Sequence, residues 1–69
     1  MKTYHVKVEV GDDGWLVAQA IEEPGAITQG RDLDELALMI RDAIELLTEE
    51  NGFQIDLMLP ASLKLARSA

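Results

Sequence analysis

The stretch from Glu22 to Leu47 constrains the fold more than any other part of the chain, because a turn, a strand and the only long helical pattern follow one another within it. Pro24 and Gly25 fit the central positions of a type II turn, where proline presets the first φ and glycine accepts a positive second φ. Residues 26–29 then indicate a short strand that closes at Gly30.

The helical pattern directly follows that strand. Asp32 and Glu35 have the spacing of a capping box, and we expect a helix from about Leu33 to Glu50. Asn51 and Gly52 tolerate the left-handed conformation and are expected to end it. The residues at helical spacing that predict a buried stripe are Leu33, Leu36, Ala37, Ile40, Ala43, Ile44 and Leu47.

Three further strands are predicted from alternation of apolar and polar residues. The first has Tyr4, Val6, Val8 and Val10 on its buried face. After a turn at residues 11–14, the second strand runs from Trp15 to Ile21, and the fourth runs from Phe53 to Leu59 before Pro60. A right-handed crossover through the helix makes the fourth strand parallel to the first. The predicted fold is therefore α+β, a βββαβ arrangement with an antiparallel meander, a parallel fourth strand and one helix on one face.

The size of the chain favours self-association. Its 69 residues predict a single domain over residues 1–60 and a short tail over residues 61–69. A domain this small is marginal as a monomer, and the absence of cysteine excludes disulfides as a source of stability. We therefore expect a homodimer or tetramer. Leu38, Met39 and Leu46 widen the apolar face of the helix, in agreement with a subunit contact.

The composition narrows the function classes. A net charge of −7 argues against direct binding of nucleic acid, while it permits a basic protein partner and equally provides simple solubility. No apolar run is long enough to span a membrane, and the N-terminus lacks the apolar centre of a signal peptide, so the expected location is the cytoplasm. With a single histidine and no cysteine, we expect no protein-built metal site and no cofactor.

The order of these elements resembles the HicB antitoxin family of type II toxin–antitoxin systems. The resemblance covers about residues 3–59 and rests on three strings: Pro24-Gly25-Ala26-Ile27-Thr28-Gln29-Gly30, Asp32-Leu33-Asp34-Glu35-Leu36 and Ile40-Arg41-Asp42-Ala43-Ile44-Glu45-Leu46. It implies a partial ribonuclease H-like fold without nuclease activity, whose role is to bind and inhibit a small basic HicA-type toxin that cleaves messenger RNA. Full-length members also carry a C-terminal DNA-binding domain, and the ten residues after the fourth strand are too few to form one.

On this reading the chain is not an enzyme, and the candidate partner-binding residues lie in and beside its turns. They are Asp12, Asp13, Trp15, Glu22, Glu23, Pro24, Gly25 and Gln29. Trp15 also fits a core or interface anchor, and the acidic residues also fit ordinary solvated turns. His5 is expected to be a solvent-facing strand residue.

Two other functions remain open at this point. One is an orphan module that keeps the fold, without a toxin partner, as a structural or small-ligand-binding oligomer. The other is a metal-dependent nuclease, which would need several carboxylates to converge on the metal ions. Its candidate carboxylates are Asp12, Asp13, Glu22, Glu23 and Asp56, and the two turn pairs are expected at opposite ends of the second strand.

Overall fold

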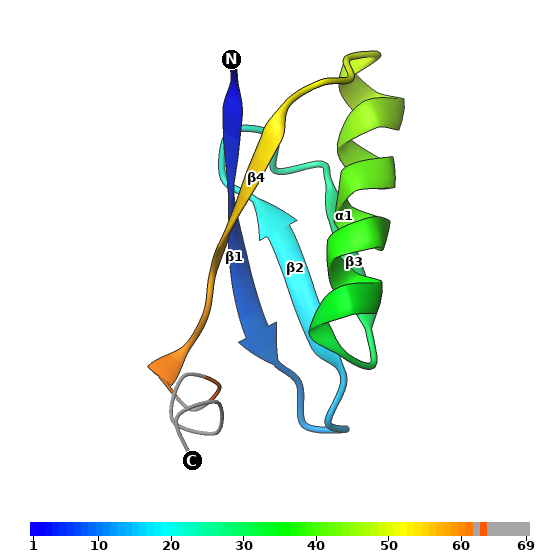
Figure 1. Ribbon diagram of the computed structural model, residues 1–69. Coiled ribbons are helices and arrows are strands. Elements are labelled where there is room, and N and C mark those ends of the chain that lie inside the picture. Colours follow the sequence, from blue (N-terminus) through cyan, green and yellow to red (C-terminus); the bar gives the residue numbers. More distant parts are fainter. Residues whose placement is uncertain (62, 64–69) are drawn as a thin grey trace.

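The computed structural model describes residues 1–61 and 63, and its elements follow one another in the predicted order. They are β1 (Thr3–Val10), β2 (Leu16–Ala20), β3 (Ile27–Gly30), α1 (Leu33–Thr48) and β4 (Gln54–Met58). The sheet has the order β3-β2-β1-β4 (Figure 1), and only the pairing of β1 with β4 is parallel. The predicted α+β fold with a βββαβ arrangement is therefore confirmed.

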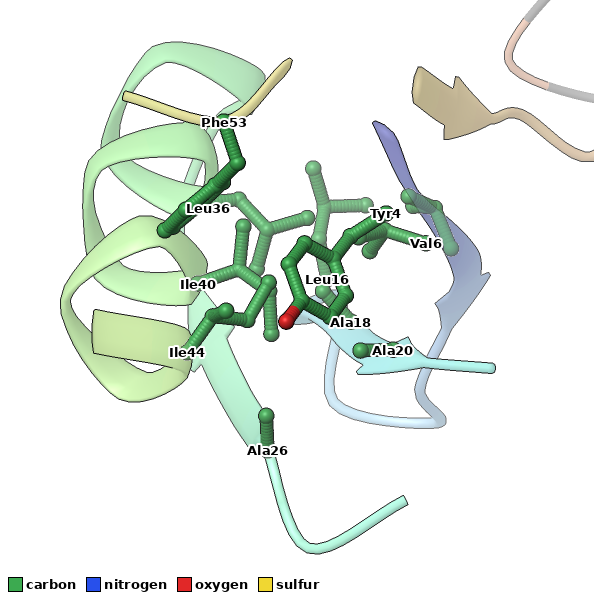
Figure 2. Packing of buried hydrophobic residues seen from close by; sticks show 11 residues of the cluster. Tyr4, Val6, Leu16, Ala18, Ala20, Ala26, Leu36, Ile40, Ile44 and Phe53 are labelled. Carbon is green, nitrogen blue, oxygen red and sulfur yellow. The ribbon is translucent and has the colours of Figure 1, made fainter. Parts of the chain in front are cut away.

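The core lies between α1 and one face of the sheet, which is here called the inner face. α1 packs against β2 and β3, and its Leu36, Ile40 and Ile44 are fully buried (Figure 2). The remaining buried hydrophobic residues are Tyr4, Val6, Val8, Leu16, Ala18, Ala20, Ala26 and Phe53. Small alanines on β2 let the bulky helix side chains approach the sheet closely.

Two residues of the predicted buried set are exposed. Val10 is 46% exposed because α1 packs over β2 and β3, so the end of β1 lies outside the area that the helix covers. Leu47 is 52% exposed because it belongs to the last helical turn, which lies next to Gly25 at the edge of the sheet. In the described part of the chain, β3 is the last strand on this side.

The turn at Pro24 and Gly25 is present, but the predicted type is wrong. Its closing hydrogen bond runs from the N–H of Ala26 to the carbonyl of Glu23 at 2.8 Å. The positive-φ glycines are Gly14 and Gly52, so Gly25 lacks the positive φ that a type II turn requires. Proline at the first central position is equally suited to a type I geometry, and the sequence could not separate the two.

A capping box predicts two hydrogen bonds at the start of α1, and the structure contains one of them as predicted. The side chain of Asp32 accepts the N–H of Glu35 at 2.8 Å, as an N-cap residue does. In the second bond of a capping box, the Glu35 carboxylate would accept the N–H of Asp32. Here it accepts the N–H of Arg31, one residue earlier. Gly30 lies beside this first turn, and a Cβ on it would come within 3.1 Å of the Leu36 backbone nitrogen.

The end of α1 comes earlier than predicted. Glu49 is the residue that caps the helix in the left-handed conformation, with φ 57°, and its N–H bonds to the carbonyl of Glu45. Gly52 also has a positive φ, of 75°, but it lies beyond the end of the helix. Thr48 also bonds back to the carbonyl of Ile44 and accepts the N–H of Glu50. These local bonds complete the last turn at a non-glycine residue.

Leu63, the last described residue, packs against the core, and its N–H bonds to the carbonyl of Pro60 at 3.1 Å. The predicted tail is otherwise largely outside the described residues, which end at 61 and 63. Within the described part of the chain, no helix combines the length and the apolar character needed to cross a membrane.

Candidate functional site

The candidate site is the sheet face turned away from α1, here called the outer face. Strand residues alternate between faces, and the register of the four strands places every second residue on this side. The outer-face strand residues are Thr3, His5, Lys7, Glu9, Val17, Gln19, Ile27, Gln29, Gln54, Asp56 and Met58. Among the described elements, the helix packs on the opposite side, so this face is open to a partner.

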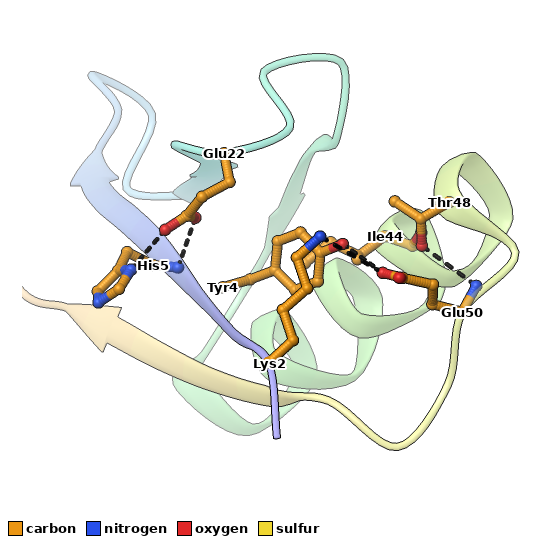
Figure 3. Close-up of polar contacts among 7 residues, drawn as sticks. All are labelled: Lys2, Tyr4, His5, Glu22, Ile44, Thr48 and Glu50. Atoms are coloured by element: carbon orange, nitrogen blue, oxygen red, sulfur yellow. Dashed lines mark hydrogen bonds and ion pairs between the residues drawn. The ribbon is translucent and has the colours of Figure 1, made fainter.

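On the β4 side of the outer face, the main polar contact joins Glu22 to His5. The carboxylate of Glu22, in the turn after β2, accepts the backbone N–H of His5 at 2.8 Å and contacts the His5 imidazole Nδ1 with its other oxygen (Figure 3). Asp56 is the register partner of His5 on β4. One imidazole therefore lies between two carboxylate residues from different elements.

This arrangement changes the titration of both groups. The hydrogen bond to Glu22, supported by the negative charges of Glu22 and Asp56, raises the pKa of His5 above its ordinary value. The same hydrogen bond lowers the pKa of the Glu22 carboxyl. Both side chains keep a substantial exposed fraction, 47% for His5 and 35% for Glu22, so water screens the pair.

A shallow hollow lies on the outer face toward the same turn. Its volume is about 210 Å³, and it is lined by Lys7, Gln19, Ala20, Ile21 and Pro24. The Gln19 side-chain amide donates to the carbonyl of Pro24 at 2.9 Å, which holds the turn against β2. The hollow places one ammonium group next to apolar surface.

The opposite end of the outer face carries the only tryptophan of the chain. Trp15 is partly buried, and the Arg31 guanidinium carbon lies 5.6 Å from the centre of its ring. The carboxylate of Asp13 accepts the Trp15 backbone N–H at 3.0 Å. Gln29 pairs with Val17 on this side of the sheet. The indole is therefore covered by the Arg31 guanidinium, and the Asp13 bond holds the Trp15 backbone just before β2.

The structure divides the predicted site residues into two groups. Asp12, Asp13, Trp15 and Gln29 lie toward the β1–β2 turn, whereas Glu22, Glu23, Pro24 and Gly25 form the β2–β3 turn. Because β2 lies between the two turns, a distance of about 17 Å separates them. The predicted residues do not converge on one point, so they fit an extended protein surface better than a compact active site.

Several outer-face residues were not among the predicted partner-binding residues. His5 was predicted only to face solvent, which it does, but its pairing with Glu22 was missed. Lys7, Gln19 and Ile21 were also missed. The alternation of apolar and polar residues along β1 indicates these positions, because residues between the buried Tyr4, Val6 and Val8 must lie on the other face of the sheet.

The carboxylates of the nuclease alternative are spread over the molecule. In residues 1–61 and 63, no group of three or more His, Asp or Glu side chains is placed to hold a metal ion. Asp12 and Asp13 lie at one end of β2, and Glu22 and Glu23 lie at the other.

Comparisons with protein-family models, with curated proteins and with solved structures found no match to this chain. The fold class stands on the structure, whereas the likeness to HicB antitoxins stays a prediction from the sequence strings.

Proposed function

We propose that this chain is a binding protein of the HicB antitoxin type, which inhibits a small, basic, RNA-cleaving toxin by covering it with the outer face of the sheet. The observation that carries the proposal is the open outer face, where exposed apolar side chains lie among acidic ones. Ile21 is 53% exposed, Ile27 is 56% exposed and Met58 is 43% exposed. Apolar surface surrounded by polar groups is typical of protein interfaces.

Acidic groups border this apolar surface on several sides. Glu9 lies on β1 and Asp56 on β4, while Asp12 and Glu22 belong to the two turns that flank β2. The chain as a whole carries a net charge of −7. Complementary charge accelerates the encounter with a basic protein and disfavours acidic competitors.

The mechanism is occlusion without a chemical step. The toxin's RNA-binding surface must be basic to neutralise phosphates, and an acidic protein face of similar extent competes for the same charges. Exposed Ile and Met side chains then exclude water from the centre of the contact, which slows dissociation. No bond is made or broken in the toxin, so activity returns when the complex dissociates.

A small-ligand role for an orphan module rests on the hollow beside Gln19 and Pro24. Its volume of about 210 Å³ falls below the range of about 300–1,000 Å³ that ligand pockets occupy. Its open, shallow shape also leaves a bound molecule largely in water. The protein-binding role therefore accounts better for the outer face.

The test begins with recovery of a small basic protein bound to this chain from its own cells, followed by purification of both. We expect this protein to cleave RNA, and we expect stoichiometric addition of the chain to stop the cleavage. Failure to inhibit cleavage by a protein that does bind would contradict the antitoxin role. Recovery of the chain alone, with no basic partner, would favour the orphan module.

A matched pair of charge reversals then tests the surface. Asp56→Lys changes the outer face, and Asp42→Lys makes the same charge change on an exposed position of α1. We expect Asp56→Lys to slow association several-fold at low salt and Asp42→Lys to leave the rate nearly unchanged. Equal effects of the two substitutions on the association rate would contradict binding of the toxin to the outer face.

A further inference from the structure

Among the residues that the structure describes, β3 forms an edge of the sheet and has unpaired backbone groups at defined positions. The N–H of Ala20 bonds to the carbonyl of Ala26, and Ala18, two residues earlier on β2, pairs with Thr28, two residues later than Ala26. In an antiparallel pair, residues alternate between bonding to the neighbour and pointing away from it. Ile27 and Gln29 therefore direct both their N–H and their C=O groups out of the sheet, past the edge.

This edge lacks the usual protection against pairing with another chain. Charged side chains, proline or a bulge normally prevent an edge strand from pairing with another chain. Residues 26–30 are Ala, Ile, Thr, Gln and Gly, with no charge and no proline, in a chain of net charge −7. The opposite edge strand, β4, carries Asp56 at its centre.

We propose that β3 pairs with β3 of a second copy of this chain, antiparallel and centred on Thr28. In this register Ile27 lies opposite Gln29 of the second copy, and the reverse pair is formed by symmetry. Each of these pairs exchanges two backbone hydrogen bonds, which satisfies all the outward-directed groups of both residues. The two four-stranded sheets thereby join into one continuous sheet of eight strands.

The same register brings the two helices into packing distance. α1 contacts both β2 and β3, so its axis lies between these strands. Strands lie about 4.8 Å apart, so the two helix axes would lie about 10 Å apart, with both β3 strands between them. Helices that pack directly have axes about 8–10 Å apart.

The helix side that would enter this contact carries exposed apolar side chains, with the acidic Glu35 and Asp42 at its border. Leu47 lies next to Gly25 in the turn that leads into β3, which identifies the side of α1 above the β3 edge. Met39 and Leu46 lie on the same side at helical spacing, and they are 45% and 81% exposed. Leu38 is 69% exposed but faces away from the sheet, one residue before Met39.

The second copy fits this edge better than a different protein does, because the pairing is self-complementary and uncharged. A dimer interface of ordinary size covers about 800 Å² on each partner. That area is a modest part of the 4685 Å² total surface. Dimerisation leaves the outer face free, so this inference does not depend on the proposed toxin binding.

Cysteine cross-linking tests the register directly, because the chain has no cysteine of its own. Thr28→Cys places two sulfurs across the symmetry axis at a pair with Cα atoms about 4.5 Å apart, which a disulfide can bridge. Ile27→Cys is the matched control, since its two Cα atoms would lie about 8 Å apart. We expect mild oxidation to give a covalent dimer with Thr28→Cys and a much lower yield with Ile27→Cys.

The mass in solution, measured by light scattering on the purified chain alone, provides the second test. We expect twice the chain mass of 7.6 kDa, and we expect association to strengthen with salt because two acidic copies repel each other. Met39→Glu should weaken the dimer by at least about tenfold, since charge is disfavoured at the centre of an interface. Leu38→Glu makes the same kind of change and should have little effect.

Gln29→Pro gives an independent disruption, because it removes an N–H that points out of the sheet and takes no part in pairing with β2. We expect this variant to be a folded monomer by circular dichroism and light scattering. A monomeric parent chain would overturn the proposal. So would a dimer that Met39→Glu and Gln29→Pro leave intact and that Thr28→Cys fails to cross-link.

Discussion

The hydroxyl of Tyr4 donates a 2.6 Å hydrogen bond to the carboxylate of Glu50, 46 residues further along the chain. Tyr4 lies at the start of β1, and Glu50 lies in the segment between α1 and β4 (Figure 3). The Lys2 ammonium lies 3.7 Å from the same carboxylate and 4.7 Å from the centre of the Tyr4 ring. This contact holds the segment that follows α1 against β1, the strand with which β4 pairs.

Tyr4→Phe tests that contact, because it removes the hydroxyl and keeps the buried ring, which packs edge-on against Phe53. We expect the free energy of unfolding to fall by about 0.5–1.5 kcal/mol, the usual value of one hydrogen bond. Urea unfolding followed by circular dichroism measures the change. Glu50→Gln keeps an acceptor and should cost less, so a larger loss there than in Tyr4→Phe would contradict this account.

Gly30→Ala tests the close approach of β3 and α1. A Cβ at Gly30 would lie 3.1 Å from the Leu36 nitrogen and 3.3 Å from its Cα, and neither backbone atom can move without shifting the helix. We expect a destabilisation of about 1–3 kcal/mol, as for overpacking elsewhere. Thermal unfolding gives the comparison.

Gly25→Ala is the matched control for this substitution. Its Cβ would meet only the flexible Leu47 Cδ1 at 3.5 Å, and Gly25 has no positive φ. We therefore expect no loss of stability, with a gain of up to about 1 kcal/mol from a less flexible unfolded chain. Equal losses at Gly25 and Gly30 would show that the close approach to Leu36 is not the cause.

Asp32→Ala tests the N-cap of α1. The substitution leaves the Glu35 N–H without its side-chain acceptor and should cost about 0.5–2 kcal/mol. Asp32→Ser restores an acceptor and should recover most of that loss. Chemical unfolding of the two variants measures the difference, and a Ser variant as unstable as the Ala variant would argue against capping as the origin.

The His5–Glu22 pair predicts a pH window. The His5 pKa is raised, so its contribution to stability is present below about pH 6.5 and is lost as the pH rises through the folded-state pKa. The Glu22 pKa is lowered, so its contribution is present above about pH 4.5 and is lost as the pH falls through its folded-state pKa. The pair therefore contributes most between about pH 4.5 and 6.5.

An NMR titration of the single imidazole checks this directly. We expect the His5 pKa to lie above its ordinary value and to fall in Glu22→Gln, which removes both the hydrogen bond to the charged form and the nearby charge. Asp56→Asn should lower it by less, because Asp56 acts only through its charge. An unchanged pKa in Glu22→Gln would show that the pair does not form in solution.

The candidate site could be predicted only in part. The sequence predicts the turn acids and Trp15, because turn chemistry and rare aromatic residues can be recognised from neighbouring residues. The pairing of Glu22 with His5, 17 residues apart, could not be read in this way, since it depends on the register between β1 and β2. The open outer face likewise follows from the side of the sheet on which α1 packs, and no local pattern encodes that choice.

The sequence by itself determined the elements, their order and the strand directions, because alternation, helical spacing, the Asp32 cap and the hand of a crossover are local or nearly universal rules. Only the tertiary structure decided which members of the apolar stripes are buried. Val10 and Leu47 follow the patterns yet are exposed, since burial requires a neighbouring element above the residue. It also decided that Glu49, which has no special preference for the left-handed conformation, ends the helix, where Thr48 bonds to the Ile44 carbonyl and accepts the Glu50 N–H.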